Sequence, residues 1–423
     1  MTLDLTEMIR GTIEKEGLGE ESEFTPTYPT GIDLFDYRNG RVEDGEAKIG
    51  VDGGKILTII GKSGTGKTAF GMKVAKTVVE PFEQGQVFHL DFERATNKAR
   101  IAQITGWNQE KIDKKYILMN RKIYSESLYT LTKSIAKIKL DNFEALKIDT
   151  GKLDRKGEPI FVLPPTVILI DSWALVVPKN ITEEEDLSGQ MSATAIAKTN
   201  NAIIKRITGT LEEANIMLII INHITQKIEI GMVKTQAQLN YLKQDESIPG
   251  GTSAIYLANT LLKLQASSKL EEEKDFGIKG FKVIGELIKS RSNEAGNKFE
   301  IVYHQQQGHH NDLTNFNLLK GLGLLKGNGR AYYFENAPNS KFTQKNFLEK
   351  LSENSELRSA FNQLVEENLA GYLSGALALG GEEEPELELV KHIRDDIWEA
   401  NDGNQYHYNE AEGTITEVSS KDL

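Results

Sequence analysis

The sequence feature that most constrains the fold is the stretch from Gly61 to Thr68, which matches the pattern G-x-x-x-x-G-K-[ST] in full. The mostly apolar residues 56–60 before it predict a strand, and residues 67–80 predict a helix. Between a strand and a helix, such a loop points its N–H groups at phosphate oxygens, and the helix N-terminus adds a positive dipole end. The motif therefore predicts a phosphate-binding loop made of Gly61, Lys62, Ser63, Gly64, Thr65, Gly66, Lys67 and Thr68.

Two side chains of this loop have expected roles toward ATP and Mg²⁺. Lys67 is expected to reach the β- and γ-phosphates, and the Thr68 hydroxyl is expected to ligate Mg²⁺. The alternative is a chance glycine-rich turn, which the flanking strand and helix disfavour.

Two later apolar runs end in polar side chains. Residues 167–170 lead to Asp171, which is expected to hold the Mg²⁺ shell; the alternative is an aspartate that caps the following turn. Residues 216–221 end at Asn222 and His223, which could sense the γ-phosphate, although a lone histidine there is more often a packed or capping residue.

A third strand candidate is followed by two acids, in the segment from Val87 to Glu93. Asp91 and Glu93 alternate and so share one face, with Glu93 further out. A carboxylate beside the γ-phosphate can orient and polarise the attacking water, so Glu93 is the better candidate. The alternative is a strand-end charge that faces solvent.

The wider pattern predicts an α/β fold with a mostly parallel sheet flanked by helices, because apolar strands and helical stretches alternate from Lys55 to about His304. The expected strands are 56–60, 87–91, 166–171, 216–222, 259–265 and 281–289, and the expected helices are 67–80, 127–138, 190–214 and 251–258. Residues 141–165 are expected to form a surface excursion.

The expected domains are an N-terminal helix and linker at 1–30 that contacts another subunit, a core at 31–308, a small α-rich domain at 309–377 and an acidic tail at 378–423.

Composition excludes several classes of protein. The chain has no cysteine, which excludes disulfides, thiolate zinc sites and cysteine nucleophiles. No apolar run approaches the roughly 20 residues of a membrane span, and no signal-peptide pattern is present, so a cytoplasmic protein without a membrane partner is expected. The net charge is −12, of which residues 381–423 hold thirteen acids and three bases. A net negative charge argues against a nucleic-acid partner, but its concentration in this tail leaves the rest of the chain nearly neutral and weakens that objection.

The order of these elements over about residues 28–375 resembles the core of the RecA recombinases, which include the phage UvsX proteins. The resemblance begins with residues 29–36 (PTGIDLFD) and continues through Pro249, Gly250 and Gly251 to residues 323–349. It implies a RecA-like P-loop ATPase with a small C-terminal domain. The function it implies is an ATP-dependent DNA recombinase that forms helical filaments on single-stranded DNA and promotes pairing and strand exchange with duplex DNA.

The resemblance also assigns roles to residues. Glu93 falls where the family keeps a water-activating glutamate, and Asp171 and Ser172 fall at the Mg²⁺-side strand end. His223 replaces a glutamine that links the γ-phosphate to the DNA-binding loop; it can still donate to phosphate and adds pH sensitivity. Arg100 stands near the position of an adenine-stacking aromatic, and a guanidinium can also stack on a base. These departures favour a phage protein.

Two basic residues are implied to act across a subunit interface. Lys289 and Arg291 fall where the family has two lysines that reach the neighbour's phosphates, and alternate strand residues share one face. A cation supplied in trans would couple ATP binding to polymerisation. The alternative is a solvated basic strand end.

The resemblance implies two DNA-binding loops, at about 178–192 and 224–249. The first is acidic, but the helix after it carries two basic residues on one face. The second would wedge apolar side chains between bases, with sequence-tolerant contacts; the alternative is a long mobile surface loop. The expected DNA contacts are Lys198, Lys205, Lys227, Met232, Gly250 and Gly251.

Two other functions remain open at this point. A hexameric RecA-fold helicase motor uses the same core, although 30 residues before the core are too few for a collar domain. A nucleotide-gated regulatory assembly without DNA function is the other, although no duplicated ATPase core is visible. If the recombinase interpretation holds, mediator proteins and single-strand-binding proteins are expected as further partners.

Overall fold

The computed structural model describes residues 24–183, 190–226, 239–272, 275–328 and 331–375, together with the backbone of four strands between residues 389 and 417. Residues 1–23, which hold most of the expected N-terminal helix and linker, lie outside the described residues, as do residues 184–189 and 227–238 of the expected DNA-binding loops. No described helix is long and apolar enough to cross a membrane.

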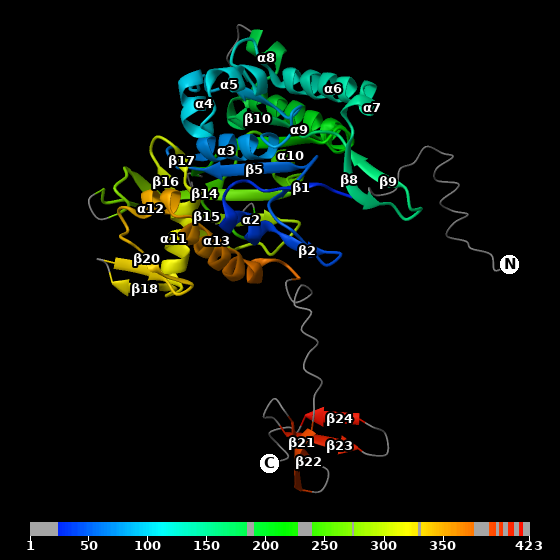
Figure 1. Ribbon diagram of the computed structural model, residues 1–423. Coiled ribbons are helices and arrows are strands. Elements are labelled where there is room, and N and C mark those ends of the chain that lie inside the picture. The colour runs from blue at the N-terminus through cyan, green and yellow to red at the C-terminus, as the bar shows by residue number, and fades with distance from the viewer. Residues whose placement is uncertain are drawn as a thin grey trace, which may run out of the picture.

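One large sheet organises the body of the molecule (Figure 1). In the described part of the chain it has nine strands in the order β17-β16-β15-β14-β5-β11-β10-β6-β7. The strands from β14 to β7 run parallel, and β15, β16 and β17 are antiparallel to their neighbours. The strands are β5 (Ile56–Gly61), β6 (Gln86–Asp91), β7 (Tyr116–Met119), β10 (Thr166–Asp171), β11 (Ile216–His223), β14 (Thr260–Lys269), β15 (Gly280–Ser290), β16 (Lys298–His304) and β17 (Gly308–His309).

The central strands are buried on both faces, as their continuous apolar sequences predict. Every residue of β5 and β10 is buried. Successive side chains point to opposite faces, so Val167 and Leu169 of β10 join one apolar core while Ile168 and Ile170 join the other.

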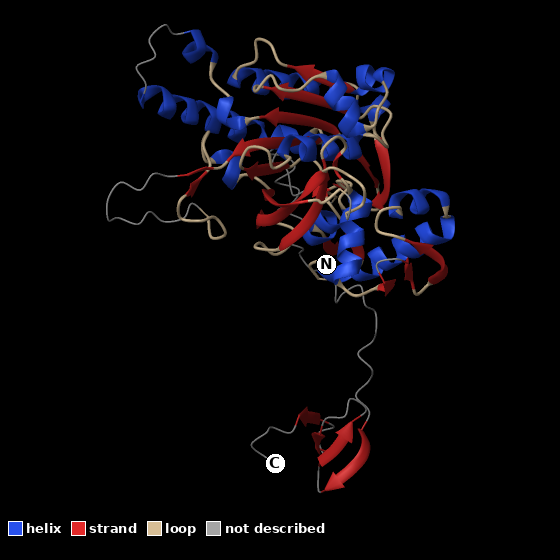
Figure 2. Ribbon diagram, turned by 90° about the vertical axis from the view of Figure 1, so that its left-hand side faces the viewer, coloured by secondary structure: helices blue, strands red, loops and turns tan. Residues whose placement is uncertain are grey.

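Helices cover both faces of this sheet (Figures 1 and 2). Apolar residues of α3, α4 and α5 pack in the first core, and those of α6, α9 and α10 pack in the second. Their bounds are α3 (Lys67–Val79), α4 (Lys98–Thr105), α5 (Gln109–Lys115), α6 (Ser125–Asp141), α9 (Gln190–Glu213) and α10 (Ser253–Tyr256). The mixed α/β architecture expected from the sequence is therefore confirmed, although α10 is shorter than the helix expected over 251–258.

The remaining elements of the body are short. The segment expected as a surface excursion folds into α7 and a hairpin of β8 and β9. The short elements are β1 (Thr27–Tyr28), α2 (Asp33–Asn39), β2 (Arg41–Glu43), β3 (Glu46–Lys48), β4 (Val51–Asp52), α7 (Phe143–Leu146), β8 (Ile148–Leu153), β9 (Pro159–Val162), η1 (Trp173–Leu175), α8 (Lys179–Glu183), β12 (Thr225–Gln226) and β13 (Glu246–Ser247).

The smaller C-terminal unit continues the first apolar core. Phe316, Phe334, Phe342, Phe347 and Phe361 are buried and pack on one another within it. The helices expected there are accompanied by a three-stranded sheet in the described residues, which the sequence did not predict. The elements are α11 (Asn311–Gly321), β18 (Leu325–Asn328), β19 (Ala331–Phe334), β20 (Ala337–Phe342), α12 (Phe347–Glu353), α13 (Ser355–Leu369) and η2 (Ala370–Tyr372).

The acidic C-terminal segment also contains regular structure that its composition did not predict. Its described strands pair in order as an antiparallel sheet. They are β21 (Leu389–Arg394), β22 (Ile397–Ala400), β23 (Gln405–Asn409) and β24 (Thr414–Glu417).

The packing of α3 on the sheet generates a first prediction. A Cβ atom on Gly71 would lie 2.9 Å from Leu169 and 3.2 Å from Ile221, both in the buried core. We expect Gly71→Ala to lower the free energy of unfolding by about 1–2 kcal/mol, because overpacking outweighs the better helix propensity of alanine. Urea denaturation measures the change.

Gly209 of α9 is the matched control. Apart from its chain neighbours and the backbone of its own helix, a Cβ atom there meets no described atom within 4 Å. Gly209→Ala should therefore stabilise the protein by about 0.5–1 kcal/mol through helix propensity alone. Equal effects of both substitutions would contradict the close contact between α3 and the sheet.

Candidate active site

The loop between β5 and α3 has the backbone that phosphate binding requires. Gly64 and Gly66 have φ angles of +77° and +84°, which side chains other than glycine rarely adopt. A Cβ atom on Gly66 would also lie 2.8 Å from the Tyr303 ring. The loop then leads directly into α3, whose first turn carries Lys67 and Thr68.

Lys67 is held inside the loop. Its side chain is buried, and its Nζ donates to the Lys62 carbonyl at 2.8 Å. Burial lowers the pKa of Lys67, against the opposing charges of Asp171 and Glu93. The amine therefore lies next to two carboxylates in a poorly hydrated place, where a phosphate anion would stabilise its charge.

Thr68 and Asp171, which are both expected at a Mg²⁺ site, lie in contact. The Thr68 hydroxyl donates to Asp171 Oδ2 at 2.5 Å, joining α3 to the end of β10. Burial, with the neighbouring charges of Glu93 and Asp91, raises the pKa of Asp171 to about 6 despite the Thr68 hydrogen bond.

This pair fits Mg²⁺. The charge of Lys67 does not offset the burial of Asp171, whose pKa stays raised, and among the described residues the buried Oδ1 of Asp91, on the adjacent strand, has no hydrogen-bond partner. No described cluster of three or more His, Asp or Glu residues could hold a metal by itself. Mg²⁺ commonly takes one or two protein ligands and completes its shell with phosphates and water, which Thr68 and Asp171 permit. Bound Mg²⁺ would neutralise phosphate charge at this place.

Glu93 and His223 form a direct pair across the edge of the sheet. Their Oε1 and Nε2 atoms are 2.7 Å apart, and each side chain is about one-third exposed (30% and 32%). Burial acts to raise the pKa of Glu93, but the hydrogen bond from His223 and the charge of Lys67 outweigh it and lower the pKa. Glu93 therefore stays ionised to lower pH, whereas burial keeps a proton on Asp171 to higher pH.

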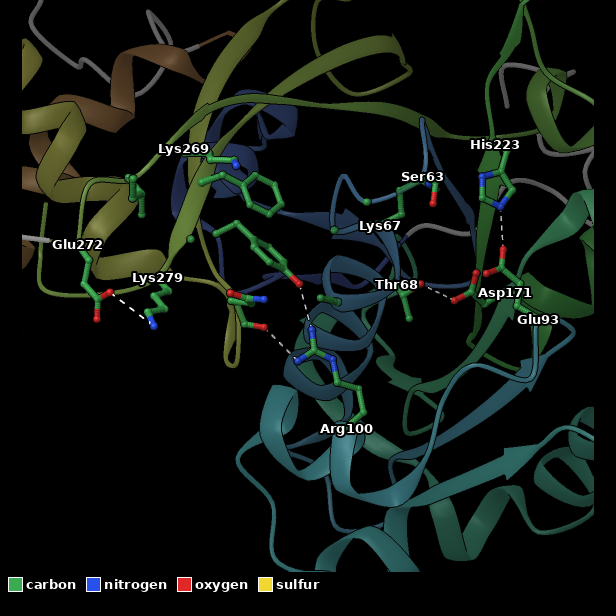
Figure 3. A pocket seen from close by; sticks show the side chains of 18 residues that line it. Ser63, Lys67, Thr68, Glu93, Arg100, Asp171, His223, Lys269, Glu272 and Lys279 are labelled. Atoms are coloured by element: carbon green, nitrogen blue, oxygen red, sulfur yellow. Dashed lines mark hydrogen bonds and ion pairs between the residues drawn. The ribbon is translucent and has the colours of Figure 1, made fainter.

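A cavity of about 730 Å³ joins these groups (Figure 3). Its walls include Lys67, Thr68, Glu93, Asp171 and His223 toward one end, together with loop residues Ser63, Gly64 and Gly66. Gly61, Lys62, Thr65 and Ser172 are near in sequence but do not line it, and Ser172 is buried.

Arg100 lies in the other part of the cavity. Its guanidinium donates to the Tyr303 hydroxyl at 3.0 Å and to the Gln306 carbonyl at 2.9 Å. The Tyr303 ring stacks on Phe281 with centroids 4.6 Å apart, and both rings line the cavity. An aromatic and guanidinium wall of this kind suits a nucleobase.

Sequence reasoning missed Tyr303, Phe281 and His309. His309 is buried, with its Nε2 3.1 Å from the Gly66 carbonyl, so it supports the phosphate-binding loop from behind. These residues carry no motif. The signal that could have found Tyr303 is the alternation of Phe299, Ile301 and Tyr303, which predicts the unassigned strand β16.

Lys289 and Arg291 lie away from this cavity. Lys289 Nζ donates to the Tyr256 carbonyl at 2.6 Å, and Arg291 Nη2 to the same carbonyl at 3.4 Å. The structure thus places both on one face, as strand alternation predicts. Burial and the charge of Arg291 lower the pKa of Lys289.

The residues expected to contact DNA are partly described. Lys198 and Lys205 are exposed on α9, and Gly250 and Gly251 form a half-buried turn with φ angles of +91° and +101°. Ser253 N donates to Asn201 Oδ1 at 2.9 Å, which ties this turn to α9. Lys227 and Met232 lie outside the described residues.

Comparisons with known proteins agree with this architecture. No family model matches the chain. Protein RecA of Aquifex aeolicus (strain VF5) is 24% identical over 356 residues, covering 82% of this chain and 85% of that protein. Protein RecA of Syntrophus aciditrophicus (strain SB) is 20% identical over 341 residues, covering 80% and 84%, and Protein RecA of Pseudomonas putida is 23% identical over 239 residues, covering 56% and 61%. These low-identity similarities, with the nucleotide loop and the mostly parallel sheet, support a RecA-like family and a P-loop ATPase.

Proposed function

We propose that this chain is an ATP-dependent DNA recombinase that forms filaments on single-stranded DNA and exchanges strands with a homologous duplex. The observation that carries the proposal is the 2.7 Å hydrogen bond between Glu93 and His223. It joins the candidate water-activating residue to the end of β11, where the second expected DNA-binding loop (about 224–249) begins. A cytoplasmic, DNA-associated location, and mediator and single-strand-binding partners, follow from this proposal.

In this proposal ATP lies along the cavity. Its phosphates lie against the backbone N–H groups of the loop and the Lys67 amine, and its base lies beside Arg100 and Tyr303. Glu93 accepts a proton from water as that water attacks the γ-phosphate, and its lowered pKa keeps it ionised for this task. His223 positions Glu93 and donates to phosphate when that pair opens.

The filament completes the site. Lys289 and Arg291 share one face and line no part of the cavity of their own chain. Their role is to supply positive charge to the phosphates of a neighbouring copy, which stabilises the charge that develops during transfer. ATP binding then favours assembly, and hydrolysis favours release.

DNA lies on the side of the turn at Gly250 and Gly251. Their backbone N–H groups and the exposed Lys198 and Lys205 contact the sugar–phosphate chain, which carries no base code. Base pairing between the two DNA molecules then supplies sequence specificity. The two alternative functions are a hexameric helicase motor and a regulatory assembly without DNA function.

Removing the proposed base should abolish hydrolysis and leave nucleotide binding intact. We expect Glu93→Gln to lower kcat by about 10²-fold or more, because glutamine cannot accept the proton. Glu83→Gln changes an exposed glutamate (80% exposed side chain) and is the matched control. Steady-state ATPase assays and nucleotide titration check this; a Glu93→Gln enzyme of normal rate would remove Glu93 from the mechanism.

Removing Lys289 and Arg291 tests whether a neighbouring copy completes the active site. Single-stranded homopolymeric DNA should stimulate the wild-type ATPase strongly. We expect Lys289→Ala with Arg291→Ala to lower the stimulated rate by about 10³-fold, as for other cations supplied in trans, while ATP still binds.

The control is Lys282→Ala with Lys298→Ala, which removes two lysines that pair with Glu300 and Glu286 on β15 and β16. It should keep the stimulation. A wild-type rate indifferent to DNA would overturn the recombinase and favour the regulatory assembly. DNA-stimulated hydrolysis in closed rings, with strand separation and no strand exchange, would favour the helicase.

The Glu93–His223 pair predicts a change of pKa. Glu93 has a lowered pKa in the folded protein, so its carboxylate persists as pH falls below the ordinary value of 4.5. Since the His223 hydrogen bond lowers this pKa, His223→Ala should raise it, and the base should become protonated at higher pH. NMR titration of selectively labelled glutamate carboxyls, with Glu93 assigned from Glu93→Gln, measures the shift. An unchanged pKa of Glu93 in the His223→Ala variant would show that the His223 hydrogen bond does not lower it.

A further inference from the structure

The turn at Pro249, Gly250 and Gly251 is tied to two strand ends of the nucleotide site. Asn222 Nδ2, at the end of β11, donates to the Pro249 carbonyl at 2.7 Å. Trp173 Nε1, just after the end of β10, donates to the Gly250 carbonyl at 2.7 Å. The carbonyls of Pro249 and Gly250 therefore accept hydrogen bonds from residues at the ends of β11 and β10, which are neighbouring strands of the central sheet.

Trp173 is tightly packed against the end of β10. Its side chain is 1% exposed and packs in the second apolar core with Ile168, Ile170 and Ile204. A Cβ atom on Gly250 would lie 2.6 Å from Trp173 Cδ1, so the turn lies directly on the ring. Because the ring contacts the turn and is hydrogen-bonded to its carbonyl, a displacement of the carbonyl must move the ring or break the hydrogen bond.

The two residues that hold the turn are adjacent to residues of the proposed hydrolysis site. Trp173 follows Asp171 by two positions, and Asn222 precedes His223, which contacts Glu93. The backbone N–H groups of Phe92 and Glu93 donate to the Asp171 carbonyl at 2.6 and 3.2 Å. The segment from Asp171 to Trp173 therefore contacts both Glu93, through its backbone, and the Gly250–Gly251 turn.

We propose that Trp173 is a positioning residue that couples DNA at the Gly250–Gly251 turn to hydrolysis, through its indole N–H bond to the Gly250 carbonyl. This inference rests on the proposed function, in which that turn contacts DNA. Phosphates bound at the turn shift the Gly250 carbonyl, the indole ring follows, and the end of β10 carries the shift to Asp171 and Glu93. Trp173 touches neither nucleotide nor DNA.

Trp173→Phe removes the donor and keeps a large aromatic ring. We expect the DNA-stimulated kcat to fall by about tenfold, which lies within the usual range of coupling between sites, while the rate without DNA and the KM for ATP stay unchanged. In the wild type, adding oligo(dT) without nucleotide should change the Trp173 contribution to the emission spectrum, obtained by subtracting the spectrum of Trp173→Phe.

Trp107→Phe is the matched control. Trp107 is also buried and donates from Nε1, to Glu80 Oε1 at 2.8 Å, in the connection between α4 and α5. The same chemical change there should leave both the stimulation and the oligo(dT)-dependent emission intact. A loss of stimulation in both variants would show a general effect of tryptophan removal and overturn the proposal.

The remaining outcomes separate the inference from the proposed function. A wild type and a Trp173→Phe variant with equal DNA stimulation would overturn the coupling role and leave the recombinase intact. A wild type without stimulation would overturn both. If Trp173→Phe does not fold, benzothienylalanine at position 173, in a chain with phenylalanine at the other two tryptophans, keeps the ring and replaces N–H by sulfur. The same loss of stimulation is expected there, and retained stimulation would overturn the proposal.

Discussion

The parallel pairing of β6, β10, β11 and β5 is the constraint on which the rest of the molecule depends. Their registers bring Asp91 beside Asp171 and His223 beside Gly61. Parallel strands end at one edge of a sheet, so side chains that are far apart in sequence meet there without any loop to arrange them. Both faces of these strands are buried, so a slip in register would bury the wrong side chains and is strongly opposed.

The same edge gives its two main carboxylates opposite properties. Asp171 lies deeper, where burial raises its pKa to about 6, and only the Thr68 hydroxyl and the Lys67 charge oppose this. Glu93 is closer to solvent and accepts a hydrogen bond from His223, which lowers its pKa. Environments that separate the pKa values of neighbouring acids commonly separate their roles. A buried acid suits a cation, and an ionised, partly solvated one suits a base.

The sequence predicted the parts of this site that lie on regular, strongly apolar strands. The loop from Gly61 to Thr68, Asp171 and Glu93 follow such strands, and six expected strands occur close to their expected bounds. Tyr303 and His309 escaped prediction because they reach the site only through the antiparallel extension of the sheet, whose register no local pattern specifies. The strands of the acidic segment were missed because composition alone carries no pairing information.

Lys289 and Arg291 show why one chain is an incomplete description of the proposed enzyme. In the described part of the chain both cations donate to the Tyr256 carbonyl at the end of α10, and neither is paired with a carboxylate. Carbonyl acceptors orient the two groups without neutralising them, so their charge stays available to an anion. The short helix α10, whose Tyr256 carbonyl accepts from both cations, follows the Gly250–Gly251 turn directly. Trp173 and Asn222 donate hydrogen bonds to that turn. In the proposed filament, a shift of the turn on DNA would therefore move both Glu93 and the two cations proposed to act on a neighbouring copy, so that DNA binding, assembly and hydrolysis would be coupled through one turn.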